Sequence, residues 1–123
     1  MAIDPAVARK TLAGVRLVNG TLGLLAPEFL LRRLGTDPAV DGSGVYPFRM
    51  FGIRTVLIGA DLLLLDGSDR RRATQMAVVI HASDTLSAAC AGWRGHLPRK
   101  VAVMTTAISA VNTALAVIAT RER

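Results

Sequence analysis

Four long apolar segments run along the chain, separated by short stretches rich in charged residues, glycine and proline. The first follows Asp4-Pro5, where a carboxylate that can cap a helix precedes a proline suited to the first turn. The sequence DGSDRRR closes the second segment, and Trp93-Arg94-Gly95 closes the third. We therefore predict four helices in a single domain spanning 1–123, over about residues 5–26, 46–65, 73–93 and 101–119.

A shorter apolar stretch lies between the first two predicted helices. In PEFLLRRLG, leucines and a phenylalanine are interspersed with Arg32 and Arg33. Residues 28–34 are too few to cross a bilayer, but they could form an amphipathic helix that lies in the membrane interface. The sequence TDPAVDGSG that follows is polar and contains breakers, so we predict a loop there.

The final segment carries the strongest membrane signal. Residues 101–119 are 19 consecutive uncharged residues, about 28 Å of helix and close to one hydrocarbon thickness. Hydrophobic residues make up 51% of the chain, more than a soluble domain this small can readily bury. Short connections make consecutive helices antiparallel. We expect an all-α, up-down four-helix transmembrane bundle in contact with the lipid bilayer; the alternative is a soluble helical bundle.

The charge distribution refines this picture. The formal net charge is +6, but the basic residues cluster at the ends of apolar runs instead of forming a stripe, which argues against nucleic acid as a partner. With four spans, both termini share a side with the loop at 66–72. That side holds seven arginines and lysines and the other side five. The positive-inside rule therefore places both termini in the cytoplasm. Arginine outnumbers lysine thirteen to two, which fits a GC-rich bacterial genome, so we expect the inner (cytoplasmic) membrane of a bacterium.

Each predicted helix also carries one polar or small face. Pairs such as Arg54 and Asp61, seven residues apart, project from the same face of a helix. A charge at the centre of a membrane helix costs about 2.5–3.5 kcal/mol, and turning the four polar faces together lowers that cost. We predict a polar intramembrane network formed by Arg16, Asn19, Arg54, Asp61, His81, Asp84 and Asn112.

Three functional interpretations of this network remain open. The charges can fix which helix packs where. They can form a proton-linked path or a site for a small polar solute in an oligomeric carrier. They can also belong to a lipid-facing enzyme with His81 as base and Asp84 as its orienting partner, although no nucleophile stands at a diagnostic spacing. His81 and His96 make no metal set, Cys90 is the only cysteine, and no cofactor motif is present.

Two stretches carry a resemblance to a family. GVRLVNGTLGLLAPEFLLRRLG and FRMFGIRTVLIGADLLL resemble small, uncharacterised four-helix membrane proteins common in actinobacteria. The shared features are an Arg and Gly on the first helix, the R-x-x-G-[IV]-R motif at Arg49 to Arg54, and an Asp matching Asp84. The resemblance implies the four-helix membrane architecture and adds nothing about chemistry. Of the open interpretations, we favour a non-catalytic accessory or self-associating bundle, as a homo-oligomer or with a partner membrane protein.

Overall fold

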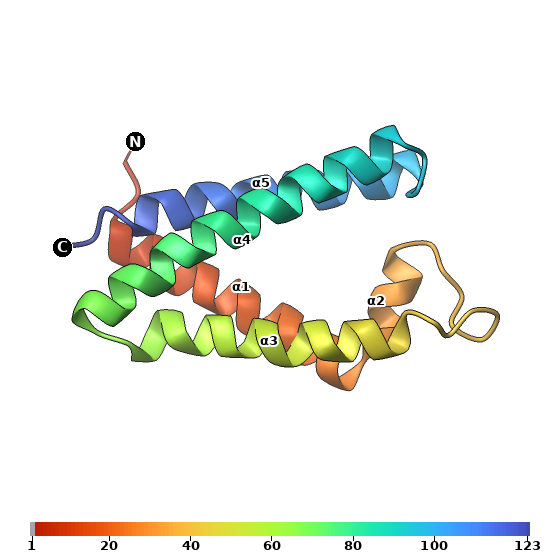
Figure 1. The fold of residues 1–123 in the computed structure, drawn as a ribbon, viewed down its shortest axis with the longest axis horizontal. Helices are drawn as coiled ribbons and strands as arrows, with labels where there is room; N and C mark the ends of the chain where they lie inside the picture. The colour runs from red at the N-terminus through yellow and green to blue at the C-terminus, as the bar shows by residue number, and fades with distance from the viewer. Residues whose placement is uncertain (1) are drawn as a thin grey trace.

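The structure is a computed structural model that describes residues 2–123, and this part of the chain contains five α-helices and no β-strand. The predicted all-α class is confirmed. The predicted helices match four long helices, and residues 28–34 fall in a fifth, short one (Figure 1). The helices are α1 (Pro5–Leu25), α2 (Pro27–Arg33), α3 (Val45–Leu64), α4 (Gly67–Trp93) and α5 (Arg99–Ala119).

Helix α1 begins and ends where the local chemistry of the sequence requires. The Asp4 carboxylate accepts hydrogen bonds from the backbone N–H groups of Ala6 at 2.8 Å and Val7 at 3.3 Å. These bonds satisfy two donors that lack partners within the first turn. The helix stops at Ala26, and Pro27 starts α2 without a backbone N–H to leave unpaired.

Helix α4 begins earlier than the sequence pattern predicted, at Gly67 instead of residue 73. Its first two turns are the polar sequence GSDRRR, which carries no apolar stripe and therefore gave no helical periodicity. Gly67 has φ of +58°, a conformation that glycine adopts without strain. This bend lets α4 follow α3 after only Leu65 and Asp66, and Asp69 in the first turn suits the positive end of the helix dipole.

The four long helices alternate in direction and pack as two pairs, α1 with α3 and α4 with α5 (Figure 1). The pairs come together near the two termini and diverge towards the end that carries α2. The accessible surface is 7780 Å², whereas a compact protein of 13.0 kDa exposes about 6,300 Å². The excess surface is consistent with this divergence.

Glycines bring α1 and α3 into backbone contact. A Cβ added at Gly20 would lie 2.6 Å from the backbone nitrogen of Val56 and 2.8 Å from the carbonyl oxygen of Gly52. A Cβ at Gly52 would in turn meet the backbone of α1, including the oxygen of Gly20 at 2.7 Å. Neither helix can therefore carry a larger residue here without moving apart from the other.

Near the termini, a small apolar core and a partly buried ion pair hold the helix pairs together. The core consists of Leu12, Ala13, Leu62, Ala77 and Ala116. Beside it, Arg9 donates from Nε to Glu122 Oε2 at 2.6 Å, from Nη2 to Glu122 Oε1 at 3.3 Å, and from Nη1 to the carbonyl oxygen of Leu62 at 2.6 Å. Arg9 thereby ties α1 to α3 and to the residues that follow α5.

One helix in the described part of the chain is long and apolar enough, by length and composition, to cross a membrane: α5, with a mean hydropathy of 1.9. Only 17% of its most apolar stretch is buried inside the bundle. By contrast, α1 and α3 each contain three charged residues. Large hydrophobic side chains are nevertheless exposed on all five helices.

Candidate functional site

Three of the predicted network residues meet between the two helix pairs. Arg16 of α1 is 5% exposed and His81 of α4 is fully buried. The Arg16 Nη1 lies 3.4 Å from His81 Nδ1, and the Asp84 Oδ2 lies 3.8 Å from the same ring nitrogen. The guanidinium also lies over the ring of Phe51, 5.8 Å from its centroid, close enough for a cation–π contact.

The contact between Arg16 and His81 determines which tautomer the imidazole adopts. A guanidinium has donors and no acceptor, so the Nδ1 of His81 must accept the hydrogen bond. The proton of a neutral ring then resides on Nε2. That atom is buried and has no hydrogen-bond partner among residues 2–123, and the same is true of the Arg16 Nε. Within this part of the chain, two buried polar groups are thus left without partners at the centre of the bundle, where orphaned donors are costly.

Arg16 and Asp84 open onto a cavity of about 430 Å³ between the helix pairs. Polar side chains reach the cavity from three helices: Asn19 from α1, Ser87 from α4, and hydroxyl and amide side chains from α5, including the buried Asn112. Apolar side chains lie among them on α4 and α5, including Ala88, Ala91 and Ile108. Larger apolar side chains form the wall on the side of α2 and α3: Leu30, Leu34, Phe48 and Phe51.

Arg54 approaches the same region from α3. Arg54 is exposed, but it lines a second hollow of about 260 Å³, which Arg16, Phe51 and Asp84 also line. The charged side chains around the two hollows are therefore Arg16, Arg54 and Asp84. Two guanidiniums against one carboxylate leave an excess of one positive charge when His81 is neutral.

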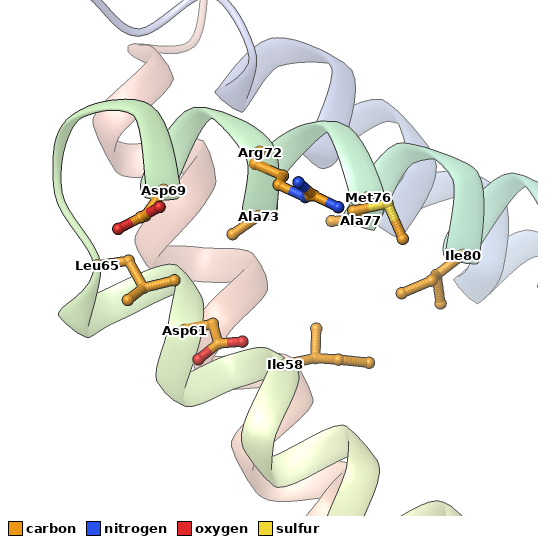
Figure 2. Close-up of a pocket in the computed structure, with 9 residues that line it drawn as sticks. All are labelled: Ile58, Asp61, Leu65, Asp69, Arg72, Ala73, Met76, Ala77 and Ile80. Carbon is orange, nitrogen blue, oxygen red and sulfur yellow. The ribbon is translucent and has the colours of Figure 1, made fainter.

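Asp61 lies apart from the other predicted network residues. It is exposed on α3 and lines a hollow of about 350 Å³ between α3 and α4, together with Asp69 and Arg72. Figure 2 shows these three side chains around the hollow, with Ile58 and Ile80 on the side away from the α3–α4 turn. No ion pair joins Asp61 to either arginine of the network among residues 2–123. Arg54 and Asp61 share one face of α3, and Ile58 and Ile80 line the hollows of both. Asp61 is two turns further along the helix, about 10 Å nearer the start of α4.

The site can bind and orient a polar group, but the described residues offer little for catalysis. No group of three His, Cys, Asp or Glu side chains gathers anywhere in residues 2–123 to hold a metal. Ser87 and Ser109 line the cavity without a hydrogen bond to His81. Its strongest chemical feature is a buried guanidinium whose one hydrogen bond in the described structure is to an imidazole.

Sequence reasoning missed two groups of residues near this centre. Phe51 was counted only as an apolar residue, although it faces the Arg16 guanidinium. The hydroxyls of Thr85 and Thr113 lie 3.2 Å apart between α4 and α5. Each also lies within hydrogen-bond distance of the carbonyl four residues earlier, and because each has one proton, a hydroxyl that donates to its carbonyl can only accept from the other. The i, i+4 spacing of His81 to Thr85 was visible, but the partner helix was not.

Comparisons of the chain with protein-family models, with curated proteins and with solved structures gave no match.

Proposed function

We propose that this chain is a small multi-pass membrane protein of the bacterial inner membrane, a non-catalytic helical bundle that associates with itself or with another membrane protein. The observation that carries the proposal is the surface of α5. This helix is uncharged after Lys100, and its outward side is apolar. The exposed large side chains on it are Val103, Ile108, Val111 and Val117.

The distribution of polar residues supports the same proposal. The side chains of Arg16, His81 and Asn112 are buried between helices, while valines, leucines and isoleucines face outwards. In water this arrangement would expose apolar surface and bury costly polar groups. In a bilayer, the outward side chains contact lipid and the polar groups avoid it.

Arg54 supports the self-association part of the proposal. It lies near the middle of α3 and is exposed, and an arginine facing lipid at that depth costs about 2.5–3.5 kcal/mol. The cost falls if the side chain turns into the hollow beside Asp84 or meets a polar group of a second copy. Replacing Arg54 by leucine should therefore alter the oligomer distribution in detergent while leaving helix content unchanged. Size-exclusion chromatography with light scattering measures that distribution.

Membrane insertion is tested by labelling with a maleimide that cannot cross membranes. Cysteines are placed singly at Val111, in the middle of α5, and at Arg121, beyond its end, in a Cys90→Ser background. Both positions are exposed in the isolated chain. In opened membrane vesicles, the cysteine at 121 should react and the one at 111 should react only after detergent denaturation. Equal labelling of both positions before detergent would contradict the proposal.

A second candidate is a carrier for a proton or small polar solute. It is favoured by Asp84, whose carboxylate is 48% exposed at the cavity while its neighbour His81 is fully buried. An accessible carboxylate beside buried polar groups is a typical proton relay. Proteoliposomes with a trapped pH dye should then acidify faster than empty ones under an inward proton gradient, and Asp84→Asn should abolish the difference. Equal rates with and without protein would exclude this candidate.

A further inference from the structure

We propose that the 430 Å³ cavity binds a single-chain amphipathic carboxylate, a fatty-acid anion, with its head group at Arg16 and its hydrocarbon chain against the wall formed by α2 and α3. The inference rests on the proposed membrane location, because a bilayer supplies such molecules and presents them from the side. Four observations support it: an incompletely paired buried cation, an excess of positive charge over the cavity and the hollow beside it, an apolar wall, and a cavity that both helix pairs line.

The head group is assigned from the hydrogen-bonding state of Arg16. A guanidinium has five N–H donors, and the structure gives this one a single hydrogen bond, the 3.4 Å contact with His81. No carboxylate among residues 2–123 lies within ion-pair distance of it. A ligand carboxylate would supply the bidentate pairing that guanidiniums favour. Arg16 is 95% buried and lines the cavity, so the pair would form where water screens it little.

The charge around the site selects a monoanion. The cavity itself is lined by one cation, Arg16, and one anion, Asp84, and Arg54 of the adjoining hollow adds a second cation. Over the two hollows, one further carboxylate brings the sum to zero. A cation would add to the positive excess, and a phosphate monoester with up to two charges would exceed the balance. Asp84 must then oppose the ligand, because it is a like charge lining the same cavity. This gives the two charged residues effects of opposite sign on binding.

The hydrocarbon chain is assigned from the larger apolar side chains of the cavity. Leu30 of α2, Leu34 just after that helix, and Phe48 and Phe51 of α3 form an apolar wall. A small polar solute would leave this wall in contact with water or with polar atoms, which gains nothing from the hydrophobic effect. An acyl chain would cover it. The helix pairs diverge towards the end that carries α2 (Figure 1). The α2 and α3 residues that line the cavity belong to that end, so we expect a chain to enter there, sideways from lipid.

The test is a fluorescence titration of the full-length chain, purified in a non-ionic detergent, with cis-parinaric acid as the reporter. Oleate and oleyl alcohol, which share a chain and differ in charge, then compete for the site. We expect oleate to displace the reporter at concentrations about tenfold or more below those of oleyl alcohol, because only oleate can pair with the guanidinium. Equal displacement by the two would show nonspecific uptake of acyl chains and would overturn the proposal.

Substitutions test the opposite signs. Arg16→Gln should weaken oleate binding by about tenfold or more and remove the preference over oleyl alcohol, whereas Asp84→Asn should tighten binding by removing a like charge. Arg49→Gln is the matched control, since this exposed arginine of α3 lines neither hollow. A tightening in Asp84→Asn that is absent in Arg49→Gln supports the assignment. If the affinity for oleate is unchanged in both Arg16→Gln and Asp84→Asn, the assignment is overturned.

Two precautions keep the outcomes distinct. If circular dichroism shows that Arg16→Gln does not fold, Arg16→Lys takes its place. Lysine keeps the charge but cannot make the two parallel hydrogen bonds of a guanidinium to a carboxylate, so this variant should bind oleate more weakly than the parent. Asp84 is half exposed, so Asp84→Asn tests the proposal independently. The membrane location is judged from cysteine labelling alone. Labelling as expected without oleate preference would reject the ligand and leave the membrane proposal standing.

Discussion

The ion pair between Arg9 and Glu122 offers the sharpest test of how the end of the bundle near the termini is held closed. Glu122 is the acceptor for two nitrogens of Arg9, at 2.6 and 3.3 Å. The Arg9 side chain is 6% exposed and the Glu122 side chain is 18% exposed. Glu122→Gln keeps the shape of the side chain and removes its charge. It leaves a buried guanidinium with the carbonyl oxygen of Leu62 and a neutral amide as its acceptors.

The expected cost follows from that geometry. Removing one partner of a fully buried pair costs about 3–5 kcal/mol, but Glu122 keeps some access to water and glutamine can still accept one bond. A hydrogen bond to a charged group contributes about 1.5–3 kcal/mol. We expect Glu122→Gln to lower the free energy of unfolding by about 1.5–3 kcal/mol. Circular dichroism at 222 nm during denaturant unfolding in detergent, at pH 7, measures it.

A double-mutant cycle isolates the pair. Arg9→Met removes the buried charge and keeps much of the apolar stem, so the combined variant with Glu122→Gln leaves no stranded guanidinium. The double variant should be less destabilised than the sum of the single variants. Additive losses, or a loss of less than about 0.5 kcal/mol in Glu122→Gln, which is the range of ordinary surface substitutions, would refute the assigned role.

The same pair predicts how stability depends on pH. Hydrogen bonding from Arg9, the largest cause, and the positive charges of Arg9 and Arg70 hold the pKa of Glu122 below its ordinary value of 4.5. The stabilisation is therefore fully present above that ordinary value and is lost as the pH falls through the lower pKa of the folded state. Between pH 7 and pH 3 the parent should lose more stability than Glu122→Gln. Parallel losses in the two proteins would contradict this explanation.

Further predictions concern packing and the central contact. Gly20→Ala should destabilise the chain by about 1–3 kcal/mol because its Cβ would meet the backbone of α3. The control is Gly14→Ala, whose Cβ would have nothing within 4 Å and which should be neutral or stabilising by up to about 1 kcal/mol. Equal effects of the two substitutions in denaturant unfolding would contradict the close contact. Leu62→Ala, at a fully buried core position, should cost about 2–5 kcal/mol in the same assay. His81→Leu should cost about 1–3 kcal/mol because it removes the one hydrogen-bond partner of Arg16, and an unchanged unfolding midpoint would refute that role.

The helices were predictable because their signals are local. Asp4-Pro5 marks the start of α1, and the uncharged run after Lys100 marks α5 almost to the residue. The start of α4 was not predictable from apolar periodicity, because its first two turns contain no apolar side chain. Asp69 in the first turn and the i, i+4 pair between Asp66 and Arg70, at 3.7 Å, favour a helix there.

The site was only partly predictable because spacing identifies a face of a helix and not the neighbour that the face meets. The face shared by His81 and Asp84 does meet Arg16, and Asn19 and Asn112 line the same cavity. Asp61 shares a face with Arg54, but it lies two turns nearer the start of α4 and lines a different hollow.

The pairing of Arg9 with Glu122 could have been anticipated from topology. The four long helices alternate in direction, so the start of α1 lies beside the residues after α5. Glu122 is the one acidic residue near the C-terminus. The positive charges at this end were interpreted only as a sign of membrane orientation. Arg9 is buried, so its contribution is to packing as well as to the charge of that side.

The central claim is that these helices lie in a bilayer, and fractionation of the expressed protein tests it most directly. Membranes are washed with alkaline carbonate, which strips proteins that are attached only at the surface, and detergent is added afterwards. The outward apolar side of α5 and the buried Arg16 centre predict retention in the pellet until detergent is added. Recovery in the carbonate wash or in the soluble fraction would contradict the claim and would require another partner for the exposed apolar surface.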